Sequence, residues 1–166
     1  MDATFERKAN KQEWNTPKWV LEDLGHFELD PCAAENPLFK IADKTYNERQ
    51  NGLTKEWKGR VFMNPPYDRG HSLEKFIDKL IKHGNGIALL FCRVDTVIWQ
   101  DKILPNANSI LFLRGRVSFL QDDGTSKGPA GAPSALVSFG EENDAYLLNK
   151  WAKSEGKIGF YVKLKD

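Results

Sequence analysis

Val61-Phe62-Met63-Asn64-Pro65-Pro66-Tyr67 is the stretch that decides how this chain folds. Its three apolar residues predict a short buried strand, and the two prolines end that strand because proline donates no hydrogen bond to a sheet. Each proline also keeps the residue before it extended, which fixes where the Asn64 amide and the Pro65 carbonyl point. Two acceptors at a strand end can hold one amino group. We therefore interpret Asn64, Pro65, Pro66 and Tyr67 as a catalytic loop, although Asn-Pro also begins ordinary turns and Tyr67 could simply cap the sheet.

Strands and helices alternate on both sides of this loop. Apolar alternation and turn residues predict strands at residues 26–29, 41–46, 60–63, 87–92, 109–113, 117–120, 135–139 and 158–164, of which 109–113 and 117–120 could also be one bent ribbon. Helical periodicity predicts helices at residues 17–24, 72–83, 96–104 and 143–153, with Thr16 as the N-cap of the first and the third ending before Pro105. This order predicts an α/β fold with helices on both faces of a mostly parallel sheet that has an antiparallel edge.

Length and composition bound the class of protein. The 166 residues, 40% of them hydrophobic, suit one domain, predicted at residues 13–166 after a flexible tail at residues 1–12. The net charge of +1 offers phosphates no global attraction, so nucleic-acid binding would need a local basic face. The two cysteines and three histidines show neither disulfide nor zinc-site spacing. No apolar run approaches the roughly 20 residues of a membrane span. We expect a protein of the reducing cytosol without a metal.

Five motifs follow one another between residues 14 and 139. They are Trp14-Asn15-Thr16-Pro17, Phe27-Glu28-Leu29-Asp30-Pro31-Cys32-Ala33-Ala34, Asn51-Gly52-Leu53, Asn64-Pro65-Pro66-Tyr67 and Gly115-Arg116-Val117-Ser118-Phe119. In order and spacing they resemble the S-adenosylmethionine-dependent amino methyltransferases, most closely the small phage-type, Dam-like DNA N6-adenine methyltransferases. The resemblance implies a Rossmann-like domain that uses S-adenosyl-L-methionine on double-stranded DNA in the cytoplasm of a bacterial host cell. So small an enzyme could act as a monomer.

The resemblance also gives the loop a chemical purpose. The adenine amino nitrogen is a poor nucleophile because its lone pair is delocalised into the ring. The Asn64 side-chain oxygen and the Pro65 carbonyl would accept the two N6 hydrogens and stabilise the positive charge that develops during direct, in-line methyl transfer. The base would first flip out of the duplex and stack on Tyr67 and on Phe119, although a strand phenylalanine is as readily a core residue.

Further residues receive binding roles through the resemblance. Thr16 and Pro17 would lie at the carboxylate end of the cofactor. The methionine side would be held by Asp30, Pro31, Cys32 and Ala33, the adenine would lie near Asn51, and the ribose would be bound by Asp43 or Glu48. Phosphates would be held by Arg114, Arg116 and Lys127, unless these are only solvated loop charges. Ala33-Ala34 stands where many methyltransferases have glycines.

Rival functions share parts of the same pattern. Pro31-Cys32 resembles the motif of cytosine-C5 methyltransferases, but Cys32 belongs to the cofactor loop and Cys92 to an apolar strand, so neither is expected to be a nucleophile. An Asn-Pro-Pro-Tyr loop also suits an RNA amino group or a protein glutamine amide. A phage protein that binds DNA or a host protein without turnover is a third reading. Residues 68–72 and 121–133 are expected to select the target sequence, which the chain itself does not reveal.

Overall fold

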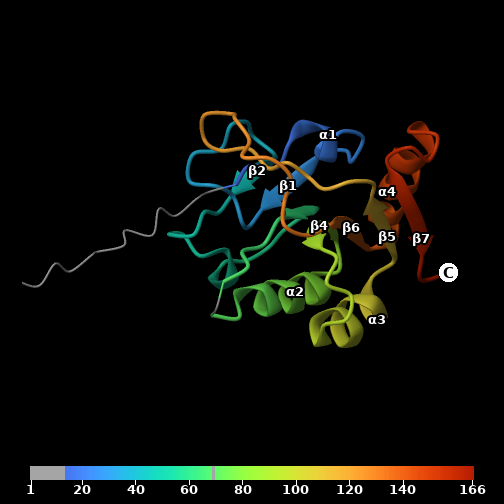
Figure 1. Cartoon of the computed structure of the whole chain (residues 1–166). Helices are drawn as coiled ribbons and strands as arrows, with labels where there is room; N and C mark the ends of the chain where they lie inside the picture. Colours follow the sequence, from blue (N-terminus) through green and yellow to red (C-terminus); the bar gives the residue numbers. More distant parts are fainter. Residues whose placement is uncertain (1–13, 69) are drawn as a thin grey trace, which may run out of the picture.

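The computed structural model describes residues 14–68 and 70–166, and in it seven strands form one sheet (Figure 1). The strands are β1 (Phe27–Asp30), β2 (Ala42–Thr45), β3 (Val61–Met63), β4 (Gly86–Phe91), β5 (Ser109–Leu113), β6 (Ser134–Phe139) and β7 (Gly159–Lys163). Their bounds lie within two residues of the predicted ones. The α/β class is confirmed. The tail predicted at residues 1–12 lies outside the described residues, so the proposed domain bounds stay a prediction.

The sheet has the order β2-β1-β3-β4-β6-β5-β7 and divides into two halves. Strands β2, β1, β3 and β4 pair in parallel, whereas β4 with β6, β6 with β5 and β5 with β7 pair antiparallel. The prediction of a mostly parallel sheet is therefore only partly confirmed. The reversal has a spatial consequence: Ser134, which begins β6, pairs with Phe91 at the carboxyl end of β4. Residues 121–133 consequently enter the sheet at that edge.

Helices cover both faces of the sheet, as predicted. One face packs under α2 (Ser72–His83) and under a π-helix, η2 (Ile98–Ile103), that continues into α3 (Leu104–Asn106); the other packs under α1 (Lys18–Leu21) and α4 (Glu141–Lys153) (Figure 1). Side chains alternate across a strand, so Met63 joins the first core and Phe62 the second. A 3₁₀ turn, η1 (Gly52–Thr54), forms where a turn was predicted. None of the helices in the described part has the length and apolar character needed to cross a membrane.

The predicted first helix is shorter than expected and is not capped by Thr16. It begins at Lys18 with Pro17 as its N-cap, and no side chain bonds to the cap. The Thr16 hydroxyl is instead engaged by Asn64. The helix ends at Leu21 because Glu22 leaves the helical region, with ψ 140°, and Asp23 then adopts a left-handed backbone, with φ 64°.

Two other local predictions were wrong. Residues 117–120 form no strand; only Leu120 pairs, in an isolated bridge with Asn15, because the chain turns away from β5 at Gly115, with φ 73°, and both flanks of β5 are taken by β6 and β7. The third helical segment does not stop before Pro105 but runs through it to Asn106. Proline needs no hydrogen-bond acceptor, so it is tolerated in a helical turn that ends one residue later.

Candidate active site

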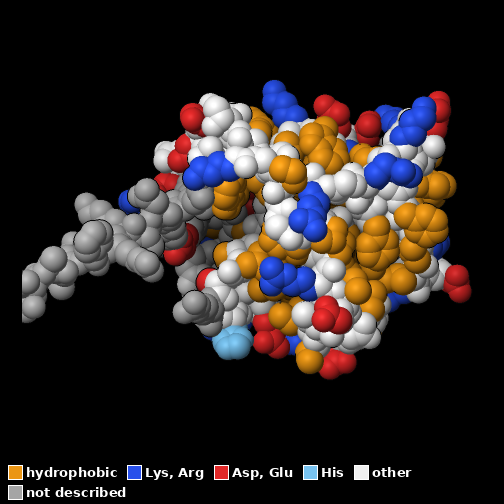
Figure 2. Space-filling model, in the orientation of Figure 1, with side chains coloured by type: hydrophobic (Ala, Val, Ile, Leu, Met, Phe, Trp, Pro, Cys, Tyr) orange, Lys and Arg blue, Asp and Glu red, His pale blue; other side chains and the backbone are white. Residues whose placement is uncertain are grey.

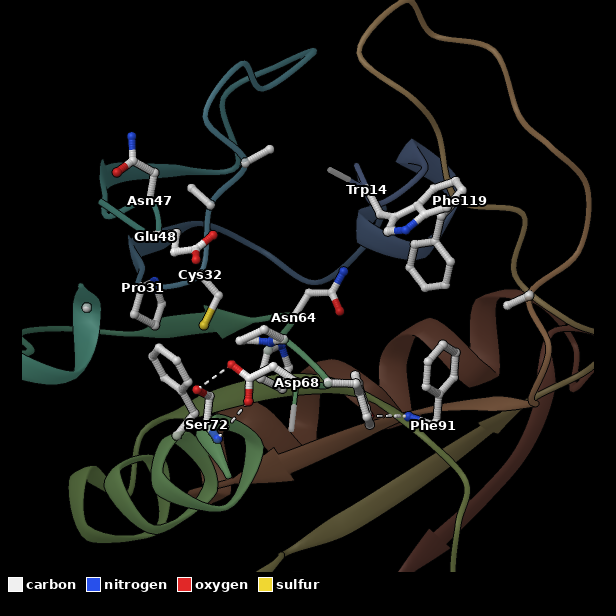
Figure 3. A pocket seen from close by; sticks show the side chains of 18 of the residues that line it. Trp14, Pro31, Cys32, Asn47, Glu48, Asn64, Asp68, Ser72, Phe91 and Phe119 are labelled. Atoms are coloured by element: carbon white, nitrogen blue, oxygen red, sulfur yellow. Dashed lines mark hydrogen bonds between the residues drawn. The ribbon is translucent and has the colours of Figure 1, made fainter. Parts of the chain in front are cut away.

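A cavity of about 920 Å³ opens at the carboxyl ends of the parallel strands β1, β3 and β4. This is the edge at which open α/β sheets bind their ligands. A second hollow of about 360 Å³ adjoins the first, and both are bordered by Trp14, Cys32, Ala33, Ala34 and Asn64. In Figure 3, Asn64 lies between Cys32 on one side and Phe91 and Phe119 on the other.

Thr16, which also borders the smaller hollow, holds the Asn64 side chain. Its Nδ2 donates a hydrogen bond of 3.3 Å to Oγ1 of Thr16, 48 residues earlier in the chain. Neither the Asn64 side-chain oxygen nor the Pro65 carbonyl accepts a hydrogen bond from the described residues. Pro65 is buried and Pro66 is exposed, and both border the large cavity. The strand end thus offers two acceptors for a ligand that carries hydrogens.

An aromatic wall stands beside these acceptors. The Tyr67 hydroxyl accepts a hydrogen bond of 2.7 Å from the Phe91 backbone N–H, and the two ring centroids are 4.8 Å apart. Phe119 packs edge-on against Phe91 at 6.3 Å. All three rings border the cavity. Burial raises the pKa of Tyr67 to about 12, so the ring is a neutral phenol at physiological pH.

Besides Thr16, two buried polar side chains border the smaller hollow, Asp30 and Asn15. Asp30 is only 4% exposed, and burial raises its pKa to about 7, although the Cys32 N–H donates to Oδ1 at 3.0 Å. Asn15 is 7% exposed; its oxygen accepts from the Leu38 N–H at 3.2 Å, while its Nδ2 has no partner among the described residues. The second Asp30 oxygen and the Asn15 Nδ2 thus have no hydrogen-bond partner among the described residues.

The turn after β2 supplies the opposite wall. Glu48 borders the large cavity, whereas Asp43 is exposed, pairs with His26 at 2.7 Å and borders neither hollow. Of the two acids considered for a ribose, the geometry therefore favours Glu48. Asn51 adopts a left-handed backbone with φ 52° and accepts from the Leu53 N–H. Gly52 touches the Pro31 carbonyl so closely that any Cβ would overlap it.

The structure does not bring every predicted site residue to the cavity. Pro17 is buried outside both linings, and Arg114 and Arg116 are exposed outside them, whereas Lys127 borders the large cavity. Burial raises the pKa of both cysteine thiols, which supports setting them aside as nucleophiles. Residues 14–68 and 70–166 contain no group of three His, Cys, Asp or Glu side chains that could hold a metal ion.

The cavity residues without a role in the sequence interpretation include Trp14, Asn15 and Phe91. Phe91 could have been found, since it ends a strand that runs parallel to β3 and so reaches the same edge. Trp14 stands in a quoted motif but its position beside Phe119 depends on the bridge between Asn15 and Leu120, for which the sequence carries no signal.

The amino-acid sequence of this chain is similar to those of known proteins. A family model described as DNA N-6-adenine-methyltransferase (Dam) matches residues 3–156. A protein of Escherichia phage T1 named DNA N-6-adenine-methyltransferase is 28% identical over 153 residues, with 79% of this chain and 63% of the phage protein covered. The chain thus spans less than two thirds of the length of that relative. No solved structure matches it.

Proposed function

Because this chain belongs to the DNA N-6-adenine-methyltransferase (Dam) family, we propose that it methylates the N6 amino group of adenine in double-stranded DNA, with S-adenosylmethionine as the methyl donor. The observation that carries the proposal is the pair of acceptors at the end of β3. Asn64 and Pro65 present two oxygens without partners in the described chain beside an aromatic wall. An exocyclic amino group has two hydrogens to donate, so it matches this pair.

The two acceptors would act mainly in the transition state. As the amino nitrogen gains a bond, it becomes tetrahedral and positively charged, and its hydrogens become stronger donors. The Asn64 oxygen and the Pro65 carbonyl then bind the reacting group more tightly than they bind the planar ground state. This differential binding lowers the barrier.

The aromatic wall would receive the base. A base inside a duplex cannot reach an atom at the bottom of a cavity, so it has to be flipped out, at a cost of a few kcal/mol. Tyr67, Phe91 and Phe119 offer ring faces and edges beside Asn64, and stacking on such rings offsets roughly 1–3 kcal/mol per base. The hydrogen bond between Tyr67 and the Phe91 N–H keeps the Tyr67 ring in place.

The residues around the smaller hollow fit the proposed cofactor. S-adenosylmethionine would supply a methyl group from a positively charged sulfonium: the bond from sulfur to the methyl carbon would break as the bond to the amino nitrogen forms, leaving a neutral thioether, and the methylated nitrogen would then lose one proton to water. Asp30, once ionised, would favour a nearby cation, and the unpartnered Asn15 Nδ2 would donate to a carboxylate. Glu48 borders the large cavity and would accept hydrogen bonds from ribose hydroxyls. Ala33 and Ala34 are small enough to let a ligand approach the backbone.

DNA binding would rest on few charges. Lys127 and its loop, residues 121–133, reach the cavity because β6 runs antiparallel to β4. On the face shown in Figure 2, Lys and Arg side chains are interspersed with Asp and Glu. Because the salt dependence of DNA affinity follows the number of phosphates that Lys and Arg contact, few such contacts would give a weak dependence on salt. Residue 69, in the other loop proposed to select the sequence, lies outside the described residues.

The test is an assay of the purified chain with radiolabelled S-adenosylmethionine and three substrates in parallel: unmethylated bacterial genomic DNA, RNA and protein. We expect label only in N6-methyladenine from DNA. Label in RNA nucleosides or in methylglutamine would assign the amino group to another substrate class. Label in none of them, with DNA still bound, would mean a binding module without turnover.

A further inference from the structure

We propose that Thr16 is a positioning residue for Asn64: its hydroxyl turns the Asn64 amide so that the oxygen, and not the NH₂ group, faces the amino group to be methylated. The inference rests on the proposed function. It departs from the role implied by the family resemblance, in which Thr16 lies at the cofactor carboxylate. The contact that carries it is the hydrogen bond of 3.3 Å from Asn64 Nδ2 to Thr16 Oγ1.

The need for such a contact follows from the shape of an asparagine side chain. Its amide has an acceptor at one end and two donors at the other, and the two ends are almost equal in size. A rotation of the amide by 180° would therefore fit the same space but would set an NH₂ group against the amino group of the base. Two donors would then face each other. A threonine hydroxyl can accept or donate; in the structure Thr16 accepts from Asn64 Nδ2, which leaves the Asn64 oxygen free to accept from a ligand.

Thr16 is well placed to provide that acceptor. Its side chain is 2% exposed, so bulk water does not compete for the Asn64 N–H. The preceding residue, Asn15, exchanges two backbone hydrogen bonds with Leu120, of 2.7 and 2.9 Å, and accepts from the Leu38 N–H. Thr16 is thus anchored to two other segments of the chain. The Asn15 Nδ2 is buried and has no partner among the described residues, so it does not compete for the Thr16 hydroxyl.

Two pairs of variants isolate the hydroxyl. Thr16→Val removes it at constant shape, and Thr16→Ala differs from Thr16→Ser by the hydroxyl alone, so the second pair serves if the valine variant does not fold. We expect the turnover number at saturating cofactor to fall about 10- to 100-fold in the valine and alanine variants and to stay within about threefold of wild type in the serine variant. The dissociation constant of S-adenosylmethionine should change by less than about threefold. Thr96→Val, which removes a hydroxyl bonded to the Arg93 carbonyl, is the control.

The opposite pattern would overturn the inference. A weaker cofactor affinity with an unchanged saturated turnover number would make Thr16 a cofactor-binding residue. Equal losses in the serine and alanine variants would show that the hydroxyl is not responsible. A further arm uses Asn64→Asp, whose two oxygens are both acceptors: there Thr16→Val should cost much less, and an equal loss would contradict the inference. Failure of the wild-type chain to methylate DNA would instead reject the proposed function.

Discussion

The buried polar groups at the two ends of the parallel strands differ in whether the chain itself supplies their hydrogen-bond partners. At the carboxyl ends of the parallel strands, Asp30, Asn64 and Asn15 keep polar atoms that no described residue satisfies. At the other edge, Arg60 is 4% exposed and sits between the rings of Phe27 and Tyr146, at 4.3 and 3.9 Å from the guanidinium carbon. At the carboxyl ends of the strands, a bound ligand would have to supply the missing hydrogen-bond partners.

The opposite edge supplies most of its own partners. Arg60 Nε donates to the Asn143 oxygen at 2.6 Å, and Nη1 donates to the His26 carbonyl at 3.0 Å. Asn143 Nδ2 donates in turn to the Phe139 carbonyl and to the Asn85 side chain. Only Nη2 of the guanidinium has no partner in the described chain. This network joins α4 to the strands, so we assign this edge to stability and the carboxyl edge to chemistry.

Of the variants considered, Asn64→Ala should have the largest effect. It should lower activity and leave stability unchanged. It removes one of the two acceptors that we propose act in the transition state, so we expect a loss of about 10²- to 10³-fold in turnover number, equivalent to about 3–4 kcal/mol. Thermal unfolding and S-adenosylmethionine binding should stay close to wild type. Asn149→Ala, at an exposed position on α4, is the control. Lost cofactor binding would mean that the loop has another role.

Asn143→Ala should reverse that pattern at the opposite edge. It removes the side-chain acceptor of a buried guanidinium and two further hydrogen bonds, so we expect the free energy of unfolding to fall by about 3 kcal/mol. Urea unfolding measures this, again with Asn149→Ala as the control. The turnover number of the folded fraction should not change. A strong loss of turnover without a loss of stability would contradict the assignment of this end of the sheet to stability.

Asp30→Asn should stabilise the protein without cofactor, in a pH-dependent way. In the unfolded chain the carboxyl has the ordinary aspartate pKa of about 4, whereas burial raises the pKa in the folded state to about 7. The folded state therefore becomes less stable as pH rises from about 4 to 7, by at most about 4 kcal/mol, and the cost is constant above that range. Because the new amide would bury N–H groups of its own, we expect a gain of about 2 kcal/mol at about pH 8 and none near pH 4. Urea unfolding at both values of pH measures this gain, and no gain at pH 8 would show that burial does not raise the pKa of Asp30 in the folded state.

Tyr67→Phe should have the smallest effect. The change keeps the ring for stacking but leaves the Phe91 N–H without its partner, so we expect a loss of stability of about 1 kcal/mol. The turnover number should fall less than about tenfold. Because the pKa of Tyr67 is about 12, the wild type and the variant should share one pH profile below about pH 10. A difference between the profiles in that range would indicate that the phenol itself takes part in proton transfer.

Local pattern was enough to place most elements of the sheet and of the site. The bounds of α2 coincide with the predicted residues 72–83, since its apolar residues recur at helical spacing. The end of β3 before Asn64 followed from two prolines. The expected strand at residues 117–120 failed for the opposite reason: its alternation was present, but β5 had no free flank to pair with it.

The sequence by itself determined the chemistry available at one strand end, because prolines and apolar runs act on their immediate neighbours. It placed Asn64, Pro65 and Tyr67 in a loop and Asp30 at the end of another strand. Only the tertiary structure decided what these residues meet. The contact between Thr16 and Asn64, the wall formed by Phe91 and the arrival of residues 121–133 at the cavity all depend on the order and direction of strands far apart in the chain. Strand order is set by which edges remain free to pair, a competition among distant segments that no short window of sequence contains.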